Sequence, residues 1–364
     1  MFYLSFKAIL PYFLQVKQNN DELWQSWNMT PELEERFIRS VRRKPRRTAS
    51  GVATITVITR PHTCSSNCIY CPCDLRMPKS YLANEPACQR AELTFFDPYV
   101  QVAARLQALH QMGHSTDKVE LIVLGGTWSD YPEGYQYWFI KELFRALNEW
   151  PNSPNHIKER LNWYTSFGLQ NSEDALSSFV AEQQAAVFDD NTTYNQAFHK
   201  LYDTSKPHQS AWLQMQSTYD ELIEQQHVNE AAAARVVGLV IETRPDTITP
   251  DNLHMFRQLG CTKIQIGIQS TRQEILDANQ RQTSVAQIKR AFSMIRLYGF
   301  KIHSHLMVNL LGATPEADKQ DFKTFVTDPG FLPDEIKLYP CALVSGTQLV
   351  QKYREGAWQP YAKD

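Results

Sequence analysis

The sequence lacks a long hydrophobic run. No stretch of its 364 residues approaches the roughly 18 apolar residues that a membrane-spanning helix needs. The most apolar end, Met1 to Leu14, carries Lys7, is interrupted by Pro11 and has no small-residue cleavage site, so we expect an N-terminal helix or extension rather than a signal peptide. We therefore expect a cytoplasmic protein without a membrane partner.

Cysteine is scarce, and the total of seven is odd, which disfavours a framework of paired disulfides. Three of the seven stand together as Cys64, Cys68 and Cys71, a C-x3-C-x2-C spacing. One alternative is a structural zinc site, which requires four ligands in a closed tetrahedron. Cys73 could supply the fourth ligand, but C-x-C is an awkward end to such a motif, and no second pair of closely spaced cysteines follows.

Three thiolates in one loop suit a different metal group. A 4Fe-4S cluster held by three cysteines keeps one iron without a protein ligand, and that iron can chelate S-adenosylmethionine and reduce it to a 5'-deoxyadenosyl radical. With the aromatic Tyr70 directly before the third cysteine, the spacing resembles the radical S-adenosylmethionine superfamily. The resemblance implies that Cys64, Cys68 and Cys71 are metal ligands and that Tyr70 contacts the cofactor.

Charge is distributed unevenly behind a net charge of −2. Residues 151–235 hold 11 acidic residues against 5 Lys and Arg, whereas Arg36 to Arg47 hold seven Arg or Lys in twelve residues. No acidic residue occurs between Glu35 and Asp74. Such a basic stripe can contact nucleic-acid phosphates, or it can be an ordinary solvated helix face.

Strand-like and helix-like segments alternate, which predicts a parallel α/β sheet. A partial barrel of six β/α units and a doubly wound sheet fit this alternation nearly equally well. The predicted strands are 52–60, 118–124, 236–242, 262–268, 301–307 and 335–339. The predicted helices between them include 98–111, 135–149, 251–259, 284–298 and 315–327.

Candidate cofactor-binding residues follow the ends of these strands. The cysteine loop follows the first strand, Gly125-Gly126-Thr127 the second, Glu242 ends the third and Gln269 follows the fourth. In a parallel barrel these ends converge on one rim, where active sites are built. The alternatives are an ordinary glycine turn, a Glu242–Arg244 pair and a strand cap at Gln269.

Two histidines, His303 and His305, lie on one face of the fifth predicted strand, because alternate side chains share a face. They could lie near a substrate, or they could be core histidines with satisfied hydrogen bonds.

Many short motifs, in order, resemble the catalytic subunit of Elongator in a bacterial-type form limited to the radical domain. They cover about 41–150 and 236–361. They are Lys44 to Ala53, Arg60-Pro61-His62, Ser80-Tyr81, Glu85-Pro86, Arg90-Ala91, Asp97-Pro98-Tyr99, Gly113-His114-Ser115, Asp117 to Glu120, Gly125-Gly126-Thr127, Ile241 to Asp246, Gly267 to Ser270 and Lys337 to Pro340.

The resemblance implies a partial (β/α)6 TIM-like barrel and a tRNA carboxymethyluridine synthase, which is a tRNA-modifying acyltransferase. Such an enzyme uses acetyl-CoA to install a carboxymethyl group on carbon 5 of the wobble uridine, position 34. The adenosyl radical would take hydrogen from the acetyl methyl group, the resulting radical would add to uracil, and hydrolysis would release the product. Lys118 matches a family lysine associated with acetyl-CoA, so it is expected at the catalytic and cofactor site.

The same resemblance assigns the basic stripe to tRNA. The expected phosphate contacts are Arg39, Arg42, Arg43, Lys44, Arg46 and Arg47, which would present an unstacked anticodon-loop uridine to the barrel. Expected partners are the tRNA anticodon loop, acetyl-CoA and an electron donor for the cluster. The sequence leaves open whether the protein forms a homodimer.

The sequence also departs from the family pattern. Cys73-Asp74 stands where the family has Gly-Gly, so a spare ligand, an oxidation liability or an inert thiol sits beside the cluster. The acidic insertion 151–235 has no repeats, and we expect helices at 174–187 and 211–227 but assign it no chemical role. We expect residues 1–50 to form an N-terminal extension and 51–364 the radical domain.

The family's acetyltransferase-like domain would begin where this chain ends at Asp364, so that domain is expected to be absent from it. The chain would then be a fragment or a stand-alone radical enzyme. A radical enzyme on another substrate and a non-catalytic tRNA-binding module are the alternative functions.

Overall fold

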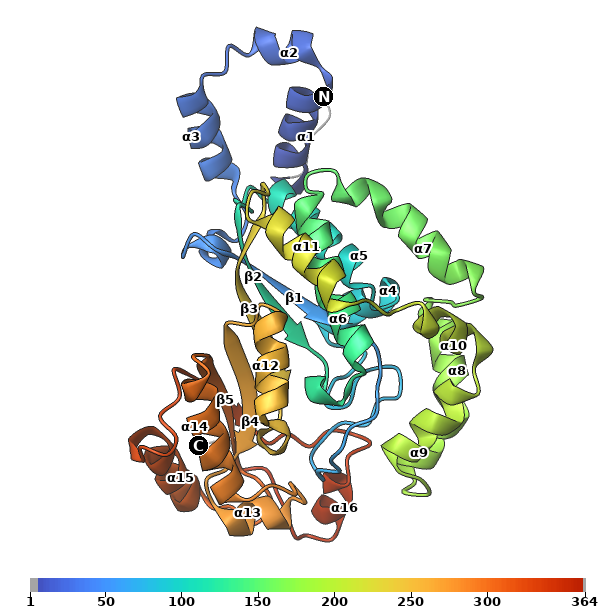
Figure 1. Ribbon diagram of the computed structural model, residues 1–364, viewed down its shortest axis with the longest axis vertical. Coiled ribbons are helices and arrows are strands. Elements are labelled where there is room, and N and C mark those ends of the chain that lie inside the picture. The colour runs from blue at the N-terminus through green and yellow to red at the C-terminus, as the bar shows by residue number, and fades with distance from the viewer. Residues whose placement is uncertain (1–5, 363–364) are drawn as a thin grey trace.

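Six parallel strands form one sheet in the computed structural model, which describes residues 6–362 (Figure 1). The strands are β1 (Ala53–Ile58), β2 (Lys118–Leu124), β3 (Arg235–Thr243), β4 (Lys263–Gln269), β5 (Lys301–Val308) and β6 (Glu335–Pro340). They pair in chain order from β1 to β6. A doubly wound sheet reverses its strand order at a switch point, so the prediction of a partial barrel is confirmed and that alternative is wrong.

Helices connect successive strands, as parallel pairing requires. They are α4 (Pro86–Leu93), α5 (Pro98–Gln111), α6 (Glu133–Asn148), α12 (Pro250–Gln258), α13 (Gln273–Ala278), α14 (Val285–Leu297), α15 (Pro315–Thr327) and, after β6, α16 (Leu349–Arg354). Several begin with a capping residue followed by proline. Asp97 accepts a hydrogen bond from the Val100 amide at 2.8 Å, with Pro98 in the first turn. These local signals explain why the predicted bounds of the five named helices agree to within two residues.

The main core lies between the sheet and the helices that follow its strands. β4 and the second half of β3 are buried almost without interruption, as expected for parallel strands covered on both faces. Large fully buried side chains such as Tyr99, Phe139, Phe256 and Phe292 fill the space between layers. The sheet is therefore a rigid frame for the loops at its carboxyl edge.

An N-terminal extension packs at the amino end of the sheet (Figure 1). It contains α1 (Phe6–Asn19), α2 (Asp21–Ser26), α3 (Pro31–Val41) and the 3-10 turn η1 (Pro45–Thr48). The predicted N-terminal helix begins at Met1, but residues 1–5 lie outside the described residues. Gly113 has φ +84°, and a Cβ there would lie 2.9 Å from Leu10 Cδ2 of α1, so this turn needs glycine for the close approach.

The insertion 151–235 is helical and lies along the flank of the sheet, beside the loop that follows β1 (Figure 1). Its α-helices are α7 (Ile157–Ser166), α8 (Glu173–Phe188), α9 (Tyr194–Phe198), α10 (Lys206–Leu213) and α11 (Tyr219–Asn229). The predicted helix 174–187 corresponds to α8. The single predicted helix 211–227 is wrong, because Thr218 and Glu221 form a capping box that starts a new helix after a break.

Within residues 6–362, no helix is long and apolar enough to cross a membrane.

Candidate active site

The three clustered cysteines line one cavity of about 470 Å³ at the carboxyl ends of the strands. Their loop follows β1 and contains no helix or strand between Thr59 and Glu85. Cys68 is buried, while Cys64 and Cys71 are half-buried. Residues within or just after the other strands complete the lining, among them Gly126, Thr127, Glu242, Gln269, His305 and Lys337. The structure therefore brings the predicted cysteines and most predicted cofactor contacts to one place.

Cys68 has the most polar surroundings of the three. Arg281 Nη1 donates to its sulfur at 3.5 Å, Arg244 Nη1 lies at 3.7 Å, and Ser66 Oγ at 3.2 Å. A hydrogen bond from the Cys71 thiol, together with the two guanidinium groups, holds the pKa of Cys68 well below its usual range. A thiolate is the form that ligates metal, so this environment favours the ligating state.

The other two thiols have hydroxyl neighbours. Ser80 Oγ donates to Cys71 Sγ at 3.2 Å, and Cys64 Sγ lies 3.5 Å from Thr127 Oγ1. No three His, Cys, Asp or Glu side chains of residues 6–362 gather closely enough to hold a single metal ion. A four-iron cluster takes one thiolate per ligated iron, so its cysteines need not converge on one point.

Four buried polar atoms in the cavity lining have no hydrogen-bond partner among the described residues. They are Tyr70 Oη, Gln269 Oε1, Arg281 Nε and His305 Nε2. Burying a polar group without a partner is costly, and such atoms point to a polar ligand. Three thiols with this ring of donors and acceptors suit an iron-sulfur cluster and a polar cosubstrate.

The turn after β2 has two glycines with different roles. Gly126 has φ +73° and lines the cavity beside Thr127. Gly125 has φ +145°, and a Cβ there would lie 1.7 Å from Thr59 Oγ1. Gly126 and Thr127 are therefore placed to contact a ligand, whereas Gly125 permits close packing against the end of β1.

Glu242, at the end of β3, accepts a hydrogen bond from Tyr81 Oη, and its Oε1 lies 4.0 Å from His305 Nδ1. Burial raises the pKa of this carboxyl group. The alternative pairing of Glu242 with Arg244 is wrong, because Arg244 pairs with Asp246 at 3.0 Å.

Gln269 lies at an irregularity in the β4–β5 pairing and has φ +72°. This left-handed conformation is unfavourable for glutamine. Its unpartnered carbonyl oxygen in the cavity wall is more consistent with ligand binding than with capping a strand.

His303 and His305 are neighbours with ring centroids 5.6 Å apart. His305 lines the cavity, whereas His303 lies 3.5 Å from Glu335. Burial, with the nearby Lys337 ammonium, lowers the pKa of His305 to about 3 and that of His303 to about 4. Both imidazoles are therefore neutral at pH 7.

Cys73 does not line the cavity. Its thiol donates to the Cys71 carbonyl at 3.4 Å and packs against an apolar cluster that includes Leu75 and Tyr194. Burial raises its pKa, so the thiol is protonated at neutral pH.

Lys118 is not at this site. It is the first residue of β2 and is exposed, at the amino end of a strand whose carboxyl end reaches the cavity. Six residue steps along a strand span about 20 Å, a distance that a lysine side chain does not bridge. The expectation that Lys118 acts within this cavity therefore disagrees with its position.

The basic stripe lies at that same amino end, because it directly precedes β1. The Arg43 amide donates to the Met112 carbonyl at 3.1 Å, and Thr48 Oγ1 lies 2.9 Å from His114 Nδ1. Exposed members are Arg39, Lys44, Arg46 and Arg47, while Arg42 and Arg43 are half-buried. The stripe and the cysteine cavity are therefore at opposite ends of the sheet.

Several site residues were not predicted from the sequence. Arg281 reaches Cys68 from the segment between α13 and α14, and Asp130 Oδ2 accepts a hydrogen bond from the Ser65 amide at 2.9 Å. Neither belongs to a recognisable local motif.

Comparisons with known proteins give a family match and several relatives. Residues 212–324 match the family described as the Radical SAM superfamily. The chain is 32% identical over 341 residues to a "tRNA uridine(34) acetyltransferase" of Methanocaldococcus infernus, covering 92% of this chain and 51% of that protein. It is 33% identical over 319 residues to a protein of the same name from Dehalococcoides mccartyi, covering 88% of this chain and 55% of that protein.

A solved structure of the archaeal Methanocaldococcus infernus Elp3, with residues 1–46 deleted, is 29% identical with a TM-score of 0.56. The match covers 85% of this chain and 50% of that one. The chain thus spans about half the length of the curated relatives it matches.

Proposed function

Over the part that it shares with these relatives, the chain belongs to the Elp3-like family of radical S-adenosylmethionine proteins, and on that premise we propose that it modifies uridine 34 of tRNA. The proposed reaction is carboxymethylation at carbon 5, with acetyl-CoA as co-substrate. The family implies a 4Fe-4S cluster and S-adenosylmethionine as cofactors. When bound, they supply a 5'-deoxyadenosyl radical.

The observation that carries the proposal is the meeting of three thiols with unpartnered polar atoms in one cavity. Cys64, Cys68 and Cys71 would hold the cluster. Arg281 and Arg244 direct N–H groups at the Cys68 sulfur and so stabilise its thiolate. Tyr70 and Gln269, which both line the cavity, would meet the cosubstrate.

Glu242, Gly126 and Thr127 are the proposed contacts for the polar parts of S-adenosylmethionine. A carboxylate can accept hydrogen bonds from ribose hydroxyl groups, and glycine lets a ligand approach the backbone closely. Glu242 is held in position by Tyr81, while neutral His305 can accept or donate a hydrogen bond without adding charge.

The basic stripe is the proposed contact for tRNA phosphates. Since it lies at the amino end of the sheet, its residues would bind the tRNA backbone away from the reacting base. Phosphate contacts fix the position of a nucleic acid, and the uridine itself would enter the cavity unstacked. Lys118 lies at the same end and is assigned no role at the reacting atoms.

The test is anaerobic reconstitution with iron and sulfide, followed by measurement of 5'-deoxyadenosine with and without tRNA and acetyl-CoA. The proposal predicts 5'-deoxyadenosine whose amount depends on tRNA. Cys68→Ser should abolish it, whereas Cys73→Ser, a matched control outside the cavity, should not.

Formation that is indifferent to both tRNA and acetyl-CoA would favour a radical enzyme on another substrate. tRNA binding without any 5'-deoxyadenosine, with the cluster intact, would favour a non-catalytic tRNA-binding module.

A further inference from the structure

We propose that the insertion 151–235 is a positioning element for the cysteine loop, with Asn195 and Gln184 as its two principal positioning residues. The inference rests on the proposed function for its meaning, since the loop would carry the cluster. The proposal gives a structural role to residues 151–235, for which the sequence alone indicated no role.

Asn195 of α9 binds both backbone groups of Cys64. Its Oδ1 accepts from the Cys64 N–H at 3.1 Å, and its Nδ2 donates to the Cys64 carbonyl at 2.8 Å. A side-chain amide that pairs with the N–H and the C=O of one residue acts as a neighbouring strand would. This pairing fixes the orientation of the Cys64 backbone, and with it the direction of its Cα–Cβ bond.

Gln184 of α8 bonds two backbone groups of the loop just beyond the third cysteine. Its Oε1 accepts from the Leu75 N–H at 2.8 Å, and its Nε2 donates to the Cys73 carbonyl at 2.9 Å. Two tyrosines add further contacts, since Tyr202 Oη donates to the Leu75 carbonyl at 2.7 Å and Tyr194 Oη to the Met77 carbonyl at 2.8 Å.

All these contacts reach backbone atoms. The loop between Thr59 and Glu85 has no helix or strand to satisfy its own N–H and C=O groups, and buried backbone groups require partners. The insertion supplies several of them at both ends of the segment that carries the three thiols. A cluster site needs ligands in fixed positions, and these hydrogen bonds would fix the backbone that carries the three thiols.

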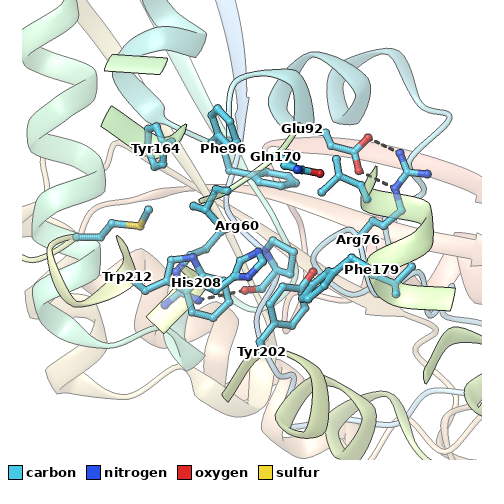
Figure 2. Close-up of a pocket in the computed structure, with 16 residues that line it drawn as sticks. Arg60, Arg76, Glu92, Phe96, Tyr164, Gln170, Phe179, Tyr202, His208 and Trp212 are labelled. Atoms are coloured by element: carbon cyan, nitrogen blue, oxygen red, sulfur yellow. Dashed lines mark hydrogen bonds and ion pairs between the residues drawn. The ribbon is translucent and has the colours of Figure 1, made fainter. Parts of the chain in front are cut away.

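The insertion is itself anchored to the sheet through aromatic packing. Figure 2 shows Arg60, which follows β1, beside Trp212 of α10, and the guanidinium carbon lies 3.9 Å from the centre of a Trp212 ring. Arg60 is only 8% exposed. Nearby, Arg76 pairs with Glu92 of α4 and donates to Ser177 Oγ of α8 at 3.0 Å. These contacts connect the sheet, the cysteine loop and the insertion.

The test compares Asn195→Ala with a matched control, Asn191→Ala, in the full chain. Asn191 lies in the same insertion but is exposed. In protein without iron, hydrogen exchange of the peptide that contains Cys64 should accelerate about thirty-fold in Asn195→Ala, the size expected for losing two hydrogen bonds of about 1 kcal/mol each. The Asn191→Ala protein should match the wild type.

Asn195→Asp keeps the acceptor for the Cys64 N–H and loses the donor, so its exchange rate should fall between wild type and Asn195→Ala. Gln184→Ala should accelerate exchange around Cys73 and Leu75 instead. If circular dichroism shows that Asn195→Ala does not fold, Asn195→Asp and Gln184→Ala are used for the test instead.

After reconstitution, Asn195→Ala should also lose iron to a chelator several-fold faster than the control, a readout independent of catalysis. Exchange and iron loss equal to the control in both Asn195→Ala and Gln184→Ala would overturn the proposal. A wild-type chain that binds no iron would contradict the proposed function, whereas faster exchange in the variants would still support the positioning role.

Discussion

Replacing Arg281 by methionine should lower the reduction potential of the cluster proposed at the three cysteines. Arg281 is 5% exposed, and its Nη1 donates to Cys68 Sγ at 3.5 Å. Its Nη2 donates to the Gly267 carbonyl, which fixes the guanidinium in place. Methionine matches the apolar stem of arginine, so it keeps part of the packing and removes the charge and the donors.

The expected size of this effect follows from the lost interaction. A hydrogen bond to a charged group is worth about 1.5–3 kcal/mol, and for a one-electron couple about 1.4 kcal/mol corresponds to about 59 mV. The reduced cluster carries more negative charge than the oxidised cluster and gains more from the donor. Because only this difference affects the potential, we expect a decrease of about 50–100 mV.

The assay is a redox titration of the reconstituted protein followed by electron paramagnetic resonance. Arg281→Lys keeps the charge and should shift the potential less than Arg281→Met. Arg272→Met, which removes a partly exposed arginine paired with Glu274, is the matched control and should leave the potential unchanged. A potential in Arg281→Met equal to that of the control would refute the role of this guanidinium at Cys68.

Three further predictions concern packing, pH dependence and tRNA. Gly125→Ala should lower the unfolding free energy by about 2–3 kcal/mol in urea titrations, because its Cβ would lie 1.7 Å from Thr59 Oγ1. Gly51→Ala, whose Cβ would have no atom within 4 Å, should lower the unfolding free energy less, and an equal loss in both variants would contradict the clash. The pKa of His305 is lowered to about 3, so as the pH falls through about 6.5 this histidine takes up a proton in the unfolded state but not in the folded state, which destabilises the fold. His305→Gln should therefore remove about 2 kcal/mol of the destabilisation seen between pH 7 and 5. An unchanged pH dependence would argue against a neutral buried imidazole. Replacing Arg46 and Arg47 together by Glu should weaken tRNA binding and reduce the slope of log affinity against log salt concentration by about two. The same change at exposed Lys319 and Lys323 should do neither, and an equal effect of the two pairs would exclude the stripe as the specific contact.

The strands and most helices were predictable because their signals are local. The alternation of apolar residues lies within a few consecutive residues of the chain. So do the Asp-Pro and Thr-Pro starts of α5 and α15. The break between α10 and α11 had a signal as well, the Thr218 to Glu221 capping box, which the expectation of one long helix overlooked.

The contacts around the cysteine loop were less predictable because they join distant residues of ordinary type. Arg281 and Cys68 are 213 positions apart, and Asn195 and Cys64 are 131 apart. No local pattern marks an arginine or an asparagine for such a contact. The rim arrangement of Gly126, Glu242 and Gln269 could be inferred because parallel strands bring their carboxyl ends together.

Position along a strand explains why the structure separates Lys118 from the cavity. Lys118 was assigned by resemblance alone, although it begins β2 while the glycine turn follows the end of the same strand. The length of a strand therefore places the two at opposite ends of the sheet.

We propose that Cys64, Cys68 and Cys71 hold a cluster with one iron open to S-adenosylmethionine. The most direct measurement is the electron paramagnetic resonance spectrum of the reduced, reconstituted chain before and after adding S-adenosylmethionine. We expect a 4Fe-4S signal that changes on addition in wild type and in Cys73→Ser, with no such cluster in Cys68→Ser. A cluster that forms equally in Cys68→Ser, or a wild-type signal that S-adenosylmethionine leaves unchanged, would contradict it.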